Sequence, residues 1–263
     1  MSNIKKAFEN GKAFIGFLTG GDPSIEKSEE FIFEMLRAGA DLIEIGVPFS
    51  DPIAEGEVIQ RANLRALAAG ATVDKLFALV ARVREKSDTP LVFLTYLNPV
   101  LHYGYEAFFK RAREAGLDGV IIPDLPFEEQ GEVRDVAREN GVDVIALVAP
   151  TSEGRAREIA ARAAGFLYVV SSMGVTGVRS EIRTDIASIV ALAKSVSDIP
   201  AAVGFGIGTP EQARELARLA DGVIVGSAIV KIIEQYGGDA GEPLRAYVKS
   251  MKAAVRDTAD GVN

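Results

Sequence analysis

The stretches RAGADLIEIG (37–46), REAGLDGVII (113–122) and RENGVDVIAL (138–147) share one pattern. In each, a helical segment ends at a glycine, and a short apolar run follows at once. Glycine is the preferred residue at a left-handed helix end, and nearly continuous apolar runs are typical of strands buried on both faces of a parallel sheet. Each stretch therefore predicts the end of a helix followed by a parallel strand.

The same unit recurs along the whole chain of 263 residues. Amphipathic segments separate eight apolar runs, and these runs are residues 13–18, 41–47, 90–96, 118–123, 143–148, 166–171, 200–206 and 221–226. Eight strand–helix units without a linker favour a closed (β/α)8 TIM barrel, an α/β fold, over a doubly wound sheet. We expect a single barrel domain over residues 1–263, with a polar tail after about residue 256.

Two connections are longer than a minimal unit requires. After the second predicted strand, residues 47–70 form a long loop and a helix, and an extra helix follows over residues 72–86. After the sixth, SMGVTGVRSEIRTD (172–185) is polar and rich in glycine. Long loops at the C-terminal end of barrel strands carry the chemistry of such folds, so we expect the active site there.

The composition excludes several classes of function. With 37 acidic and 29 basic residues the formal net charge is −8, which argues against nucleic acid as a partner. The absence of Cys excludes disulfides and thiolate nucleophiles, and a single His cannot build a His-rich metal site. The start, MSNIKKAFENGKAF, lacks the apolar core of a signal peptide, and no apolar run approaches the roughly 20 residues of a membrane span. We expect a cytoplasmic protein without a metal.

Three glycine clusters follow the sixth, seventh and eighth predicted strands: GVTG (174–177), GFGIG (204–208) and GSA (226–228). The last cluster opens a helix, whose unpaired amides and positive dipole end favour an anion. Barrels often bind phosphate with the loops after strands seven and eight. The glycines could instead only permit tight turns, but three clusters in consecutive units favour a phosphate site.

Glu44 lies inside a predicted buried strand, on the same face as Leu42 and Gly46. Burial disfavours the charged carboxylate, so its pKa should rise, as suits a general acid or base. The alternative is a structural ion pair with a Lys or Arg. The position near the catalytic end favours the functional interpretation.

Other polar residues have weaker signals. Glu55 and Asp51 lie in the loop after the second strand, where either could simply be solvated, and Asp124 after the fourth strand could cap a helix or tie down a loop. Tyr168 could point into the same cavity or be a core aromatic. His102 is predicted to be a loop residue without a catalytic role. No lysine lies in a predicted strand, so a Schiff-base aldolase mechanism lacks its amine.

Taken in order, LIEIGVPFSDPIAEG (42–56), IQRANLRAL (59–67), YVVSSMGVTG (168–177) and GSAIVKIIE (226–234) resemble the tryptophan synthase alpha subunit family. The resemblance begins near FLTGGDP (17–23) and covers nearly the whole chain. It implies the (β/α)8 fold and a lyase of tryptophan biosynthesis. Its activity would be the retro-aldol cleavage of indole-3-glycerol phosphate to indole and D-glyceraldehyde 3-phosphate.

The resemblance implies that Glu44 and Glu55 are the catalytic carboxylates. At Glu55 the sequence departs from the family, which has Asp in this motif, and Glu57 stands where Pro is usual. An extra methylene moves a carboxylate by about 1.5 Å, and a misplacement of about 1 Å can cost on the order of 10²-fold in rate. We expect either a compensating shift of the loop or a slower reaction. The implied substrate-positioning residues are Phe17, Ile59, Leu94, Tyr168, Thr176 and Phe205, and the implied phosphate ligands are Gly177, Gly206, Gly226 and Ser227.

The resemblance also implies a mechanism and a partner. Glu44 would protonate indole C3 while Glu55 accepts the N1 proton, and the segment SSMGVTGVRSEIR (171–183) would close over the substrate with Thr176 orienting a carboxylate. Indole would pass to a beta subunit in an alpha2beta2 complex. That subunit carries pyridoxal phosphate, so no cofactor is expected in this chain. The expected contact surface includes Pro48–Asp51 and Leu97–Tyr103.

Three alternatives remain. The chain could be a stand-alone indole-3-glycerol-phosphate lyase that releases free indole. It could be a catalytically weak regulatory subunit in which Glu55 marks drift. A sugar-phosphate isomerase on the same barrel is less expected, since a large apolar pocket would serve no purpose in it.

Overall fold

Alternating strands and helices close into a barrel of eight parallel strands, paired in sequence order from β1 to β8 and back to β1. The computed structural model describes residues 2–149, 153–170, 179–204 and 206–258, with the side chains of residues 179–185 excepted. The strands are β1 (Ala13–Thr19), β2 (Leu42–Gly46), β3 (Leu91–Leu94), β4 (Gly119–Ile121), β5 (Asp143–Val148), β6 (Leu167–Val170), β7 (Ala201–Gly204) and β8 (Gly222–Val225). The predicted (β/α)8 fold is confirmed.

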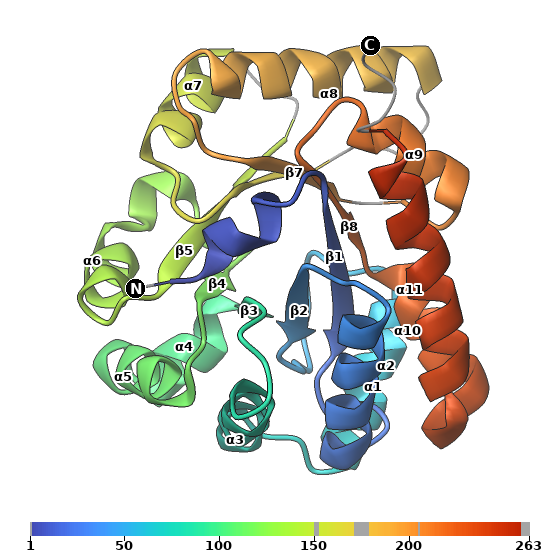
Figure 1. The fold of residues 1–263 in the computed structure, drawn as a ribbon. Helices are drawn as coiled ribbons and strands as arrows, with labels where there is room; N and C mark the ends of the chain where they lie inside the picture. Colours follow the sequence, from blue (N-terminus) through green and yellow to red (C-terminus); the bar gives the residue numbers. More distant parts are fainter. Residues whose placement is uncertain (1, 150–152, 171–178, 205, 259–263) are drawn as a thin grey trace.

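Helices surround the strands on the outside of the barrel (Figure 1). They are α1 (Ile25–Arg37), α2 (Glu57–Ala68), α3 (Val73–Arg84), α4 (Leu97–Tyr103), α5 (Tyr105–Ala115), α6 (Gly131–Glu139), α7 (Glu153–Arg162), α8 (Arg179–Lys194), α9 (Pro210–Ala217), α10 (Ser227–Tyr236) and α11 (Gly241–Arg256). Short 3-10 helices are η1 (Ile4–Phe8), η2 (Phe127–Glu129) and η3 (Gly237–Asp239). Across the described ranges, no helix has the length and apolar character needed to cross a membrane.

The extra helix predicted over residues 72–86 is present as α3. The prediction that His102 lies in a loop was wrong. His102 lies in α4 rather than in a loop. This helix has only seven residues and ends at Gly104, whose φ of +87° is accessible to glycine at little cost. A segment this short gives too little periodicity to be distinguished from a loop.

Strand pleating sorts the core into two layers. Outward-facing side chains such as Phe14 and Ile43 pack beneath the helices in the largest apolar cluster. Inward-facing side chains such as Ile15, Leu42 and Val92 fill the barrel axis together with Ile4 of η1. Because both faces of every strand are covered, the strands carry the nearly continuous apolar runs seen in the sequence.

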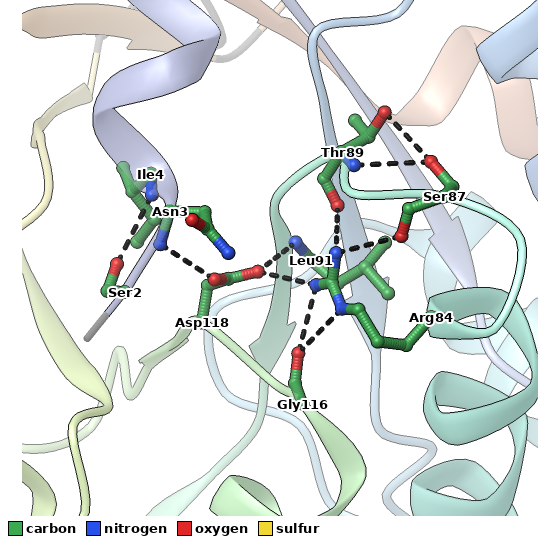
Figure 2. A network of polar contacts seen from close by, with 9 residues as sticks. All are labelled: Ser2, Asn3, Ile4, Arg84, Ser87, Thr89, Leu91, Gly116 and Asp118. Carbon is green, nitrogen blue, oxygen red and sulfur yellow. Dashed lines mark hydrogen bonds and ion pairs between the residues drawn. The ribbon is translucent and has the colours of Figure 1, made fainter.

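A buried carboxylate joins four segments at the N-terminal end of the barrel (Figure 2). Asp118 accepts hydrogen bonds from the amides of Asn3 (2.8 Å) and Leu91 (2.9 Å) and from the Arg84 guanidinium (2.7 Å). These partners come from the segment before η1, the start of β3 and the end of α3. Asp118 therefore ties the N-terminal segment to two neighbouring units.

Arg84 extends this network to three backbone carbonyls. Its guanidinium donates to the oxygens of Gly116 (2.9 and 3.1 Å), Ser87 (3.0 Å) and Thr89 (3.0 Å). Gly116 ends α5 with a φ of +80°, as its place in REAGLDGVII predicts. The side chain of Arg84 thus fixes both the α3–β3 turn and the α5–β4 turn.

Replacing Arg84 by Met is expected to destabilise the fold by about 3 kcal/mol, because Asp118 would remain buried without its cation. The matched control is Arg138→Met, which removes an ion pair between two exposed side chains of α6 and should cost no more than about 0.5 kcal/mol. Urea unfolding of both variants measures the difference. Equal free energies of unfolding would contradict the structural role of Arg84.

Candidate active site

A cavity of about 540 Å³ lies where the C-terminal ends of the strands meet the following loops. Nine residues predicted from the sequence line it: Phe17, Glu44, Glu55, Ile59, Leu94, Tyr168, Gly206, Gly226 and Ser227. Three other predicted residues, Thr176, Gly177 and Phe205, lie outside the described residues. The described candidates therefore converge on one cavity although they come from six different strand–helix units.

Glu44 is the central buried carboxyl group. Its strand position pairs it with Phe17 of β1 and Val92 of β3, and the pleat turns its side chain toward the barrel interior. The residue is 1% exposed, and its Oε2 atom has no hydrogen-bond partner within the described part of the chain. Burial, with a smaller contribution from the charge of Glu55, raises the pKa of Glu44 to about 8. Glu44 thus keeps its proton at neutral pH, and no described residue forms the alternative ion pair with it.

Two aromatic side chains in this cavity, Phe17 of β1 and Tyr168 of β6, each pack against a glycine on the next strand of the barrel. A Cβ atom at Gly46 would lie 2.7 Å from Cζ of Phe17, and one at Gly204 would lie 2.4 Å from the hydroxyl of Tyr168. Both distances are shorter than a real contact. Phe17 and Tyr168 therefore pack across positions at which no larger residue fits. Burial, followed by the charge of Glu44, raises the pKa of Tyr168 well above its ordinary value, so the phenol stays neutral.

Glu55 enters the cavity from the loop between β2 and α2. Its Oε2 accepts a hydrogen bond of 2.6 Å from Nδ2 of Asn63, a residue of α2 that is 2% exposed. Gln60 donates to the backbone carbonyl of Glu55 (2.8 Å), and the neighbouring Ala54 amide donates to the Tyr96 hydroxyl (3.1 Å). Burial raises the pKa of Glu55, and the Asn63 amide acts in the opposite direction. Asn63 of α2 therefore holds the carboxylate of Glu55, and Tyr96, the N-cap of α4, holds the loop that carries it.

Sequence reasoning missed Asn63 and Tyr96. Asn63 lies on the buried face of α2 beside Ala62 and Ala66. A polar residue on the apolar face of an amphipathic helix must find a partner, and this was the available signal. Tyr96 gave none, because an aromatic residue at a strand end is ordinarily part of the core.

Ion pairs fix the position of α2 beside the cavity. Arg65 donates two hydrogen bonds to Asp22 (2.9 and 2.8 Å), a 1% exposed residue in the loop after β1. Arg61 and Arg65 both bond Glu234 of α10. Since α2 packs against α10, these contacts keep the helix that carries Asn63 in register with the helix that begins at Ser227.

The opposite end of the cavity is built from backbone amides. Gly226 is the N-cap of α10 and has no side-chain cap, and the first intrahelical bond runs from the Val230 amide to the Gly226 carbonyl (3.0 Å). The amides of the first turn are thus available to an anion. Gly206, with a φ of +73°, lines the same end. The arrangement suits a phosphate group.

The loop after β7 is anchored from two helices. The Gly208 amide donates to Oε1 of Gln212 (2.8 Å), and the Gly208 carbonyl accepts from the Tyr247 hydroxyl (3.1 Å) of α11. These contacts hold the backbone beside Gly206 without using any charged side chain.

A second cavity of about 400 Å³ adjoins the first and shares Ala54, Glu55, Leu94 and Tyr168 with it. Its other walls are mostly apolar and include Leu125, Pro126, Phe127, Leu147 and Ile159. The combined space offers an apolar region next to the two carboxyl groups and a polar region at the start of α10. Such a space accepts an elongated ligand with an aromatic end and an anionic end.

Three other candidates line neither cavity. Asp124 accepts a hydrogen bond from the Leu97 amide (2.9 Å) in the first turn of α4, so it ties down a loop, as the structural alternative for it proposed. Asp51 and His102 are exposed.

Known proteins of one family are similar to this chain in both sequence and structure. The sequence model of one family, described as tryptophan synthase alpha chain, matches residues 2–262. The tryptophan synthase alpha chain of Lactiplantibacillus plantarum is 46% identical over 265 residues, which cover 100% of both chains. The crystal structure of tryptophan synthase subunit alpha from Legionella pneumophila has a TM-score of 0.88 at 38% identity and covers 98% of this chain and 99% of that one. A structure of the tryptophan synthase alpha2beta2 complex from Pyrococcus furiosus has a TM-score of 0.84 at 38% identity. The match covers 92% of this chain and 99% of that one.

Replacing Glu44 by Gln is expected to stabilise the protein increasingly as the pH rises from about 5 to about 8. An unfolded glutamate loses its proton near pH 4.5, whereas the folded one keeps it to about pH 8, so ionisation favours unfolding in this window. The gain over the wild type should grow by about 1.4 kcal/mol per pH unit.

Urea unfolding of both proteins at a series of pH values measures this gain. Below about pH 4.5 the carboxyl group is neutral in both states, so this point is the internal reference. A gain that stays constant between pH 5 and 8 would contradict the raised pKa.

Proposed function

This chain belongs to the tryptophan synthase alpha chain family, and we propose from that premise how its cavity cleaves indole-3-glycerol phosphate to indole and D-glyceraldehyde 3-phosphate. The observation that carries the mechanism is the meeting of two carboxyl groups, Glu44 and Glu55, in one cavity that ends at uncapped helix amides. The chemistry is general acid–base catalysis of a retro-aldol cleavage.

Glu44 begins the reaction as an acid. With a pKa of about 8 it carries its proton at neutral pH, and it gives that proton to C3 of the indole ring. Glu55 takes the proton of N1 in the same step, so the ring becomes a neutral indolenine with a C=N bond. The Asn63 amide stabilises the ionised form of Glu55 that this role requires.

Glu44 then acts as a base. Its carboxylate takes the proton of the hydroxyl group on the carbon joined to C3, and the O–H electrons form the aldehyde C=O. The carbon–carbon bond breaks, its electrons return to the ring, and N1 regains its proton from Glu55. Both carboxyl groups end in their starting states, and the step uses only side chains of this chain.

The two cavities give the substrate one orientation. The phosphate binds the amides at the start of α10, beside Gly206, Gly226 and Ser227. The indole ring lies against Phe17 and Leu94 and reaches the apolar second cavity. Fixing both ends brings C3 to Glu44 and N1 to Glu55, and such positioning is a major source of rate enhancement.

A beta subunit is the expected partner, as in the Pyrococcus furiosus alpha2beta2 complex. Indole would pass to it, and in this family the pyridoxal phosphate belongs to the beta subunit. The contact would use Pro48–Asp51 and Leu97–Tyr103. Ile53, which follows the first range closely, is 79% exposed, and Leu101, within the second range, is 57% exposed. The cytoplasmic location and the single-domain organisation expected from the sequence stay predictions.

Glu44→Gln and Glu55→Ala are each expected to lower the turnover of indole-3-glycerol phosphate by about 10²–10⁴-fold, because each removes one proton-transfer group. Indole release by the purified chain measures this loss. Glu139→Gln removes a carboxylate from the exposed face of α6 and is the control that should keep wild-type turnover. Near-wild-type turnover in either cavity variant would exclude that residue from the mechanism.

Glu55→Asp tests the departure from the family motif. The hydrogen bond from Asn63 meets the longer side chain at 2.6 Å, so shortening it by one methylene withdraws the carboxylate from this contact. We expect a fall in kcat of about tenfold with little change in KM. A faster enzyme would show instead that the extra methylene misplaces the carboxylate.

Addition of a beta subunit distinguishes the proposed role from its two alternatives. Acceleration of indole release on titration of the partner supports an alpha subunit. Full turnover of the chain alone, unchanged by the partner, would indicate a stand-alone lyase. Negligible cleavage combined with a rising rate of tryptophan formation from serine and indole would indicate a regulatory subunit.

A further inference from the structure

Negative charge in and around the main cavity repels an anionic ligand. Glu55, which is ionised in the proposed mechanism, lines this cavity, and the whole chain has a formal net charge of −8. A phosphate monoester adds up to two further negative charges at the start of α10. Backbone amides offset these charges only at contact distance, because partial charges at a helix end act within about one turn.

Lys231 is the single basic side chain in the lining of this cavity as far as the structure describes it. It follows Ser227 by four residues in α10, so the two side chains lie on the same face of the helix. That face borders the cavity at the end built from Gly206, Gly226 and Ser227. Lys231 therefore belongs to the end of the cavity at which the anion is proposed to bind.

Nearby basic residues differ from Lys231 in having partners. Arg61 and Arg65 are paired with Glu234, and Arg155 at the second cavity is paired with Glu128. Lys231 forms no hydrogen bond or ion pair with any residue that the structure describes, and its side chain is exposed. Its ammonium group is consequently available to a ligand.

We propose that Lys231 is a substrate-binding residue that pairs with the phosphate group from the mouth of the cavity. The inference rests on the proposed function and adds a residue that recognises the charge of the substrate. The amides of α10 fix the position of the phosphate, whereas the lysine attracts it over several ångströms through solvent. For an exposed lysine we expect a two- to fivefold effect on affinity, reduced by salt.

The test is Lys231→Met, with Lys249→Met as the matched control. Lys249 is an exposed residue of α11 outside both cavity linings, so the control makes the same change in net charge. The kinetics of indole-3-glycerol phosphate cleavage are measured at about 20 and 200 mM salt, which bracket a strong change in screening. We expect Lys231→Met to raise KM about fivefold at low salt with kcat within twofold of the wild type. At high salt the difference should shrink, and Lys231→Arg should keep the wild-type KM.

Inhibition by two probes distinguishes ligand recognition from a structural effect. Inorganic phosphate should inhibit Lys231→Met less than the wild type, whereas indole, which is uncharged, should inhibit both equally. Equal KM values for Lys231→Met and Lys249→Met at low salt would overturn the proposal, and so would equal weakening of phosphate and indole.

Failure of the proposed function gives a different result. A wild-type chain without cleavage activity would contradict the reaction itself. Direct titration of inorganic phosphate into the wild type and Lys231→Met would then still decide the role of Lys231: weaker binding to the variant supports it, and equal binding refutes it.

Discussion

The central constraint on this molecule is a carboxyl group kept away from water without a partner. Burying an unpaired polar atom costs free energy, and Oε2 of Glu44 has none of the described residues as a partner. The cost is lowest when the carboxyl group stays protonated, which is the state that donates a proton. The rest of the barrel must be stable enough to offset this cost, because the proposed proton transfer depends on the buried carboxyl group.

Each end of the barrel has a buried acidic residue, and the surroundings of the two residues differ. At the N-terminal end, Asp118 is also buried, but two amides and the guanidinium of Arg84 satisfy its oxygens. At the C-terminal end, Oε2 of Glu44 has no such partner among the described residues, and the glycines at positions 46 and 204 leave room for Phe17 and Tyr168. Two acidic residues on buried strands or their edges thus have opposite roles, and hydrogen-bond satisfaction is what separates them.

The groups that contact a charge differ between the two ends of the cavity. Glu55 is held by the neutral amide of Asn63, which orients the carboxylate without neutralising it. The proposed phosphate end has the uncapped amides of α10, with Lys231 at its border. The strong arginine–carboxylate pairs lie outside the cavity and fix α2 to the loop after β1 and to α10. Fixed charges therefore position the walls, while the interior keeps groups that can exchange protons or bind a ligand.

Periodicity, glycine stops and apolar runs sufficed to predict the barrel and the interior position of Glu44, because these features depend on local residue order and strand pleating. The convergence of residues from β1, β2, β3, β6 and the loops after β7 and β8 on one cavity also follows from the closed fold. Sequence could not identify the contacts of Asn63 with Glu55, of Arg65 with Asp22 or of Arg84 with Asp118, which join residues 8 to 43 positions apart. Only the tertiary structure decides them, because a hydrogen bond needs a distance and a direction, and the pattern of residue types contains neither.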